Sequence, residues 1–186
     1  MFNTWEWIRL CGFLAYFYFT ISVIFGLLRK TSSIKKQKNL LFHLHLNAGW
    51  VGFLALMVHI LLLLIDQYQP YQVKEILVPF SAQYKPLLSA LGTISLYIFL
   101  VVIFTSDVLI SVMNRKVWKS IHFLVLPAWA MSFLHGVFIG TDSSNHFIQI
   151  FYIVTGSIVI IAGSFRVYGE YSKKTTPTVR TRRSRG

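Results

Sequence analysis

Long apolar stretches alternate with short polar segments along the whole chain. Five of the stretches approach or exceed the roughly 20 apolar residues that a helix needs to cross a hydrocarbon core about 30 Å thick. They run over residues 5–28, 40–65, 86–106, 118–140 and 147–168. The pattern predicts an all-α integral membrane protein, a bundle of five transmembrane helices.

Composition agrees with this pattern. Of the residues, 55% are hydrophobic and only 13% are charged, whereas about a quarter of the residues in a soluble domain are charged. We expect one membrane domain over residues 1–170 and a basic, disordered cytoplasmic tail over residues 171–186, because the tail has almost no apolar residues to bury. The first stretch lacks a preceding basic segment and a following small-residue cleavage site, so we expect it to be retained.

The formal net charge of +12 is distributed unevenly over the connections between the stretches. Of the 18 Lys and Arg residues, 15 fall after the first or third stretch or close or follow the fifth, and only Arg9, Lys74 and Lys85 fall on the other side. By the positive-inside rule the N-terminus is expected outside and the C-terminus in the cytoplasm of a cell-membrane protein. The basic excess is then a topology signal and a surface for anionic lipids, and nucleic acid is not an expected partner.

Two further features limit the possible chemistry. Cys11 is the only cysteine, which excludes an intrachain disulfide, a thiolate metal cluster and a c-type haem attachment motif. The connection at residues 66–85 is expected outside and carries several aromatic residues. It is either an ordered cap at the interface, where aromatic residues prefer to lie, or a simple tether.

Four of the six histidines fall inside predicted spans, where an ionisable side chain is costly and indicates a functional site. His45 and His59 are 14 residues apart in the second span. On a straight helix they share one face within about 40° and stand about 21 Å apart. His122 and His135 are 13 residues apart in the fourth span, which runs in the same direction as the second.

Equal depth pairs His45 with His122, and His59 with His135. Two imidazoles that face each other at one depth suit the two axial positions of a haem iron. Two such pairs predict two haem b groups, one near each membrane surface. We therefore interpret these four histidines as haem-binding residues and axial iron ligands.

The spacing of 13 leaves His135 roughly 140° away from the face of His122 on a straight helix. Pro127 lies between them, and a proline inside a helix removes one hydrogen bond and bends the rod. The fourth span is therefore expected to bend near Pro127. His43 and His146 are interpreted as an interfacial and a solvated residue.

Glycines and tryptophans near the histidines each have two interpretations. Gly49, Gly52 and Gly136 either let a flat macrocycle approach the backbone or allow close helix packing. Likewise, Trp50 and Trp129 either flank such a ligand or pack between helices. Cationic candidates for the haem propionates are the side chains of Arg29, Lys30, Lys85 and Lys119.

Three segments together resemble the ferric reductase-like transmembrane domain, which NADPH oxidases, ferric reductases and the haem subunit of a bacterial methionine sulfoxide reductase system share. The segments are HLNAG at residues 45–49 with His59 fourteen residues beyond His45, LVPFSAQYKP at residues 77–86, and WKSIHFLVLPAWAMSFLHGVFIGTD at residues 118–142. The resemblance implies two b-type haems and electron transfer across the membrane.

The chain departs from the larger members of that family. It has no glycine-rich dinucleotide fingerprint after a strand, and we expect no flavin domain. As a component of an electron-transfer oxidoreductase it is expected to take electrons from a separate flavoprotein reductase or from membrane quinol. The outside acceptor is expected to be ferric iron or a redox protein. Two alternatives stay open: a haem-free channel or assembly factor, and a haem-bearing anchor subunit of a larger redox complex.

Overall fold

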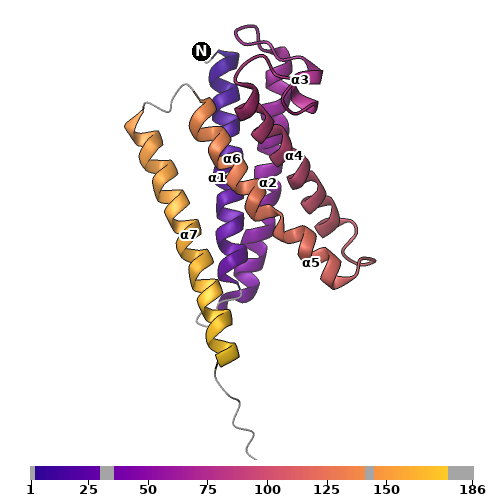
Figure 1. Ribbon diagram of the computed structural model, residues 1–186, viewed down its shortest axis with the longest axis vertical. Helices are drawn as coiled ribbons and strands as arrows, with labels where there is room; N and C mark the ends of the chain where they lie inside the picture. Colours follow the sequence, from indigo (N-terminus) through magenta and orange to yellow (C-terminus); the bar gives the residue numbers. More distant parts are fainter. Residues whose placement is uncertain (1–2, 30–35, 141–144, 176–186) are drawn as a thin grey trace, which may run out of the picture.

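The computed structural model describes residues 3–29, 36–140 and 145–175, and every regular element within these ranges is helical. The helices are α1 (Thr4–Leu28), α2 (Lys38–Ile65), α3 (Val73–Leu77), α4 (Pro86–Asp107), α5 (Arg115–Phe123), α6 (Val125–Ile139) and α7 (His146–Thr175). Figure 1 shows α3 beside the N-terminal end of α1 and α5 at the opposite end of the bundle. We call these the α3 end and the α5 end.

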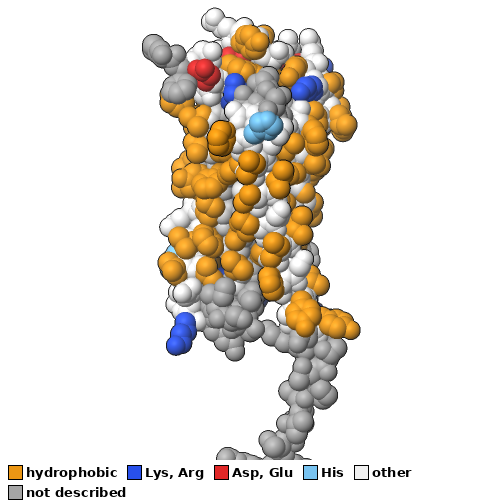
Figure 2. All heavy atoms as spheres, turned by 90° about the vertical axis from the view of Figure 1, so that its left-hand side faces the viewer, with side chains coloured by type: hydrophobic (Ala, Val, Ile, Leu, Met, Phe, Trp, Pro, Cys, Tyr) orange, Lys and Arg blue, Asp and Glu red, His pale blue; other side chains and the backbone are white. Residues whose placement is uncertain are grey.

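Five helical segments are long and apolar enough to cross a membrane, as the hydrophobic pattern predicts. They are Thr4–Leu28, Lys38–Ile65, Pro86–Asp107, Arg115–Ile139 and His146–Gly169. Figure 2 shows apolar side chains over the middle of one face and charged side chains towards its two ends, which is the distribution that a bilayer requires. The chain is a multi-pass integral membrane protein.

Consecutive spans run in opposite directions, with α1 packed along α2 and α4 packed along α6 (Figure 1). The last helix, α7, lies against α1 and α6. It continues to Thr175, past the boundary expected at residue 170, and the rest of the expected tail, residues 176–186, lies outside the described residues.

The connection at residues 66–85 is an ordered cap that contains α3. The Glu75 carboxylate accepts hydrogen bonds of 2.8 Å from the backbone N–H groups of Gln72 and Gln83. These two bonds hold the pKa of the Glu75 carboxyl below its usual range. Lys85 ends the cap and donates a hydrogen bond of 2.9 Å to the carbonyl of Phe138, at the end of α6.

The fourth span is interrupted between its two histidines. Helix α5 ends at Phe123, and Leu124 donates to the carbonyl of Ile121 at 2.9 Å, a tight i to i−3 bond, before α6 begins. The break lies at the residues that Pro127 affects most, because a proline ring clashes with the carbonyl four residues before it. The bend expected near Pro127 is therefore present, and it divides the span into α5 and α6.

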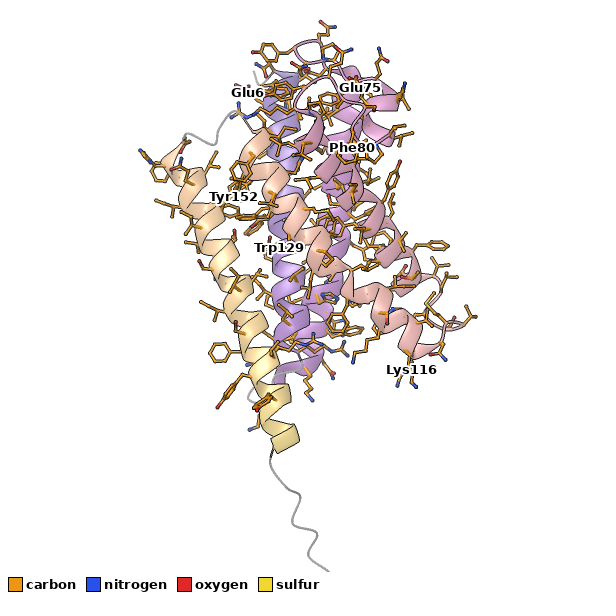
Figure 3. All side chains as sticks on the ribbon, in the orientation of Figure 1. Glu6, Glu75, Phe80, Lys116, Trp129 and Tyr152 are labelled. Carbon is orange, nitrogen blue, oxygen red and sulfur yellow. The ribbon has the colours of Figure 1, made fainter. Side chains whose placement is uncertain are left out.

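Aromatic side chains form the core where α1, α6 and α7 meet. The indole of Trp129 on α6 donates a hydrogen bond of 2.8 Å to Thr20 on α1, and the hydroxyl of Tyr16 bonds Thr155 on α7 at 2.8 Å. Figure 3 shows Trp129 and Tyr152 between the two ends of the bundle. Polar groups buried in an apolar medium require such partners.

Replacing Thr20 by valine tests the bond to Trp129. Valine has nearly the same shape but leaves the buried indole N–H without its acceptor, which is expected to lower the free energy of unfolding by about 1–3 kcal/mol. Thr20→Ser keeps a hydroxyl and is the control. Thermal unfolding in detergent, followed by circular dichroism, should rank Thr20→Val below Thr20→Ser. Equal stability of the two variants would show that the bond does not hold α1 to α6.

Candidate functional site

The histidine pair at the α5 end consists of His45 on α2 and His122 on α5. Their ring centroids are 5.9 Å apart and their planes are inclined by 73°. Two imidazoles on opposite sides of one metal ion, each bound at about 2 Å, have ring centres about 6 Å apart. The spacing of this pair therefore fits two axial ligands of a single iron.

The pair at the α3 end, His59 on α2 and His135 on α6, lines a cavity of about 590 Å³. This volume lies within the range of pockets that hold small molecules and cofactors. Helices α1 and α4 contribute apolar side chains such as Phe13 and Leu96 to its walls, and residues of α3 and α7 also line it. Within the described part of the chain, no group of three or more His, Cys, Asp or Glu residues is placed to hold a metal ion.

Polar side chains border this cavity towards the α3 end. Arg9, Tyr71 and Glu75 are among its lining residues. The Tyr71 hydroxyl bonds Ser89 at 3.2 Å, and burial raises the pKa of that hydroxyl. The cavity therefore has an apolar body and a polar rim with one guanidinium, an arrangement suited to a flat apolar ring that carries carboxylates.

Three of the four histidines bond a main-chain carbonyl of a neighbouring helix through Nδ1. The pairs are His45 with Ser22, His59 with Ile8, and His135 with Leu88, each at 2.8 Å. When Nδ1–H donates to a carbonyl, the lone pair of the neutral ring is on Nε2, the nitrogen that then binds a metal. The carbonyls therefore orient these rings so that Nε2 of each could bind a metal ion.

A glycine stands four residues after each of these carbonyls. It is the residue whose N–H bonds the same carbonyl within the helix, and any side chain there would meet the imidazole. Added Cβ atoms at Gly26, Gly12 and Gly92 would lie 3.2, 3.0 and 2.7 Å from the nearest ring atoms of His45, His59 and His135. Glycine is therefore what lets the imidazole reach a carbonyl that is already in a helical bond.

Sequence reasoning missed these glycines, although the chain carries a signal for them. Gly12 and Gly26 are 14 residues apart, the same spacing as His45 and His59 on the adjacent antiparallel helix. If each imidazole on one helix needs a glycine on the neighbouring helix, the glycines and the histidines are expected to have the same spacing. Recognising the match requires knowing that the first and second spans pack together.

His122 is held differently. Its Nδ1 lies 3.1 Å from the hydroxyl oxygen of Ser106 on α4. The same oxygen accepts a hydrogen bond of 3.2 Å from the indole N–H of Trp118, whose ring stacks on His122 at 5.0 Å between centroids. In the sequence Trp118 only opens the segment that contains His122, and its bond to Ser106 is seen in the structure alone.

The glycines singled out from the sequence serve helix packing. Added Cβ atoms at Gly49, Gly52 and Gly136 would meet side chains of Ser22, Phe19 and Tyr152 on α1 and α7, at distances of 3.4, 3.1 and 2.5 Å. Close packing therefore accounts for Gly49 and Gly52, whereas Gly136 packs against Tyr152 and also lines the cavity at the α3 end. Trp129 likewise packs in the core, and Trp50 is exposed on α2.

The remaining histidines lie outside the pairs, whereas Arg29, one of the basic candidates, lies near enough to His45 to interact with it electrostatically. His43 and His146 are exposed. Arg29 lies over the ring of Phe42 at 4.1 Å, and Lys30 is outside the described residues. Arg9, which lines the cavity, was not among the cationic candidates taken from the sequence.

Two buried phenylalanines occupy the middle of the bundle. Phe19 on α1 is seven residues from both Gly12 and Gly26, and Phe99 on α4 is seven residues from both Gly92 and Ser106. Their rings stack with centroids 4.1 Å apart and planes inclined by 8°. By helix register, the stacked pair therefore lies halfway between the two histidine pairs.

Comparison with known proteins gives one family. Residues 11–134, two thirds of the chain, match the family described as ferric reductase like transmembrane component. The matched region contains His45, His59 and His122 and ends one residue before His135. Neither a curated protein nor a solved structure matches the chain.

Gly92→Ala tests the close approach of His135 to α4. Because the new Cβ would lie 2.7 Å from the ring, the imidazole must move, and we expect the free energy of unfolding to fall by about 1–3 kcal/mol. Gly163→Ala on α7 is the control, since nothing lies within 4 Å of its added Cβ. That change should stabilise the helix by about 0.5–1 kcal/mol. Thermal unfolding should therefore shift in opposite directions, and a shift in the same direction would contradict the packing described.

Proposed function

Because the chain belongs to the ferric reductase-like transmembrane family, we propose that it is a di-haem b-type cytochrome that transfers electrons across the cell membrane. The observation that carries the proposal is the arrangement of four histidines in two pairs at two depths. One pair has rings 5.9 Å apart, and the other borders a cavity of about 590 Å³.

The residues present fit two haems. His45 and His122 would hold one iron at the α5 end, and His59 and His135 would hold the other at the α3 end. Haem supplies reversible one-electron chemistry, and two histidine ligands leave no open position for oxygen. The chain's own contribution is to fix the ligand nitrogens, with carbonyls that orient three of the rings, and to exclude water with apolar helices.

Cations and aromatic rings around the sites support the same function. Arg9 lines the cavity at the α3 end, where propionate carboxylates need a positive partner. The stacked rings of Phe19 and Phe99 fill the space between the two sites and keep water out of it. Packed side chains, rather than solvent, therefore lie between the two sites.

We assign the α5 end to the cytoplasm. Exposed basic residues gather there, including Lys36, Lys38, Arg115 and Lys116, and the positive-inside rule places such residues inside. His45 and His122 would then hold the haem that accepts electrons from a flavoprotein or from membrane quinol. His59 and His135 would hold the haem that supplies them to ferric iron or to a redox protein outside.

A haem-free channel or a single metal site accounts less well for these residues. A metal ion bound by protein alone needs its ligands within a few ångströms of one point, and the histidines form two separate pairs. Each ring of one pair is also oriented by a main-chain carbonyl, as metal-bound imidazoles usually are.

Haem content of histidine variants tests the proposal. The purified wild-type chain should contain two haem b groups, and His59→Leu should contain one, because the site at the α3 end has lost an axial ligand. His43→Leu on the same helix is the matched control and should keep both, since His43 is exposed and lies outside the pairs. Pyridine haemochrome spectra normalised to protein give the count.

A wild-type chain without a Soret band would overturn the haem assignment itself. Two haems retained in His59→Leu would leave the cytochrome in place and refute the pairing. A haem lost from His43→Leu would show that a ligand had been misassigned on α2.

A further inference from the structure

The four imidazoles are not equivalent in what their Nδ1 atoms face. For His59 and His135 the partner is a main-chain carbonyl at 2.8 Å. Nδ1 of His45 lies 2.8 Å from the main-chain carbonyl of Ser22 and 2.9 Å from the hydroxyl of the same residue. For His122 it is the Ser106 hydroxyl, at 3.1 Å. A main-chain carbonyl in a helix has a fixed position. A serine hydroxyl can rotate and can bond a second partner as well.

Ser106 is shared with Trp118. The indole N–H can only donate, so the Ser106 oxygen accepts from it at 3.2 Å. If Nε2 of His122 binds iron, Nδ1 carries the proton and also donates to this oxygen. An oxygen that accepts two hydrogen bonds forms a weaker bond with each donor than it would form with a single donor.

We propose that Trp118 and Ser106 set the electron-donating strength of His122 and thereby the midpoint potential of the haem at the α5 end. The inference rests on the proposed function, and it assigns both residues a positioning role. A hydrogen bond from the far side of a metal-bound imidazole makes the ring a stronger ligand. A stronger ligand favours the oxidised iron and lowers the potential, and Trp118 opposes this by competing for the Ser106 oxygen.

The stacking of the Trp118 ring on the His122 ring explains why both residues bond the same hydroxyl. Trp118 lies 5.0 Å from His122 with the planes inclined by 25°, so its indole N–H and Nδ1 point towards the same hydroxyl. Both residues are on α5, and Ser106 is the second to last residue of α4. The hydrogen bonds of Trp118 and His122 to Ser106 therefore join two helices at one end of the bundle. Among the bonds of the described residues they have no counterpart at His59 or His135.

Two conservative variants should shift the potential of one haem in opposite directions. Ser106→Ala removes the acceptor from His122, weakens the ligand and raises the midpoint of the α5-end haem. Trp118→Phe keeps a stacked ring but frees the Ser106 oxygen for His122 alone, and lowers that midpoint. The other haem should not change in either variant, and Ser106→Thr, which keeps a hydroxyl, should stay close to the wild type.

Redox titration of the full-length protein measures both midpoints, and the same variants in a His59→Leu background isolate the α5-end haem. Ser120→Ala is the serine control, because Ser120 bonds only the backbone of its own helix. The g values of the low-spin haem signal should also move in both variants, which loss of stability alone would not produce.

The outcomes separate the two proposals. A wild-type chain without haem refutes the proposed function. Two haems whose midpoints shift in the same direction in both variants, or do not shift, refute the role of Ser106 and Trp118 alone. If Ser106→Ala does not fold, Trp118→Phe decides, since a midpoint that rises or stays constant there contradicts the inference.

Discussion

The hydrogen bond from an imidazole to a helix carbonyl, made across a glycine, is the interaction on which the rest of the arrangement depends. In hydrocarbon every polar group needs a partner inside the protein, and the carbonyls of a helix are already bonded. A carbonyl oxygen has a second lone pair, but a ring reaches it only where the facing residue has no side chain. Gly12, Gly26 and Gly92 meet that condition, and they determine how closely α1 approaches α2 and α4 approaches α6.

This constraint links helix packing to the proposed chemistry. The imidazoles of α2 are oriented by α1, a helix that contributes no histidine of its own. The imidazole of His135 is oriented by α4 in the same way. The orientation of these imidazoles is thus fixed by α1 and α4, which contact Nδ1 of the rings. The Nε2 side of each ring remains available for the cofactor. A break at Leu124 separates the helix of His122, whose ring contacts His45, from the helix of His135, which lines the same cavity as His59.

Much of this arrangement could be predicted from the sequence, because some of its causes are local. Apolar runs located all five spans, and the period of 14 placed His45 and His59 on one face. Pro127 indicated the bend in the fourth span, although the angle was not predictable, since it depends on how α5 and α6 pack. Each of these inferences uses the geometry of one helix only.

The parts that were missed depend on contacts between helices. Gly49, Gly52 and Gly136 were considered because they are near histidines in the sequence, yet their faces meet α1 and α7. Gly12, Gly26 and Gly92, which do face imidazoles, lie on α1 and α4. No local sequence pattern shows which helices pack against these two. Ser106 and Trp118 were missed for the same reason, because their shared oxygen brings together residues from two helices.

A redox titration of the purified wild-type protein, combined with its haem-to-protein ratio, tests the central claim most directly. The account predicts two haems per chain and two one-electron transitions of equal amplitude, one from each histidine pair. A single transition with one haem per chain, or the absence of a haem spectrum, would contradict it.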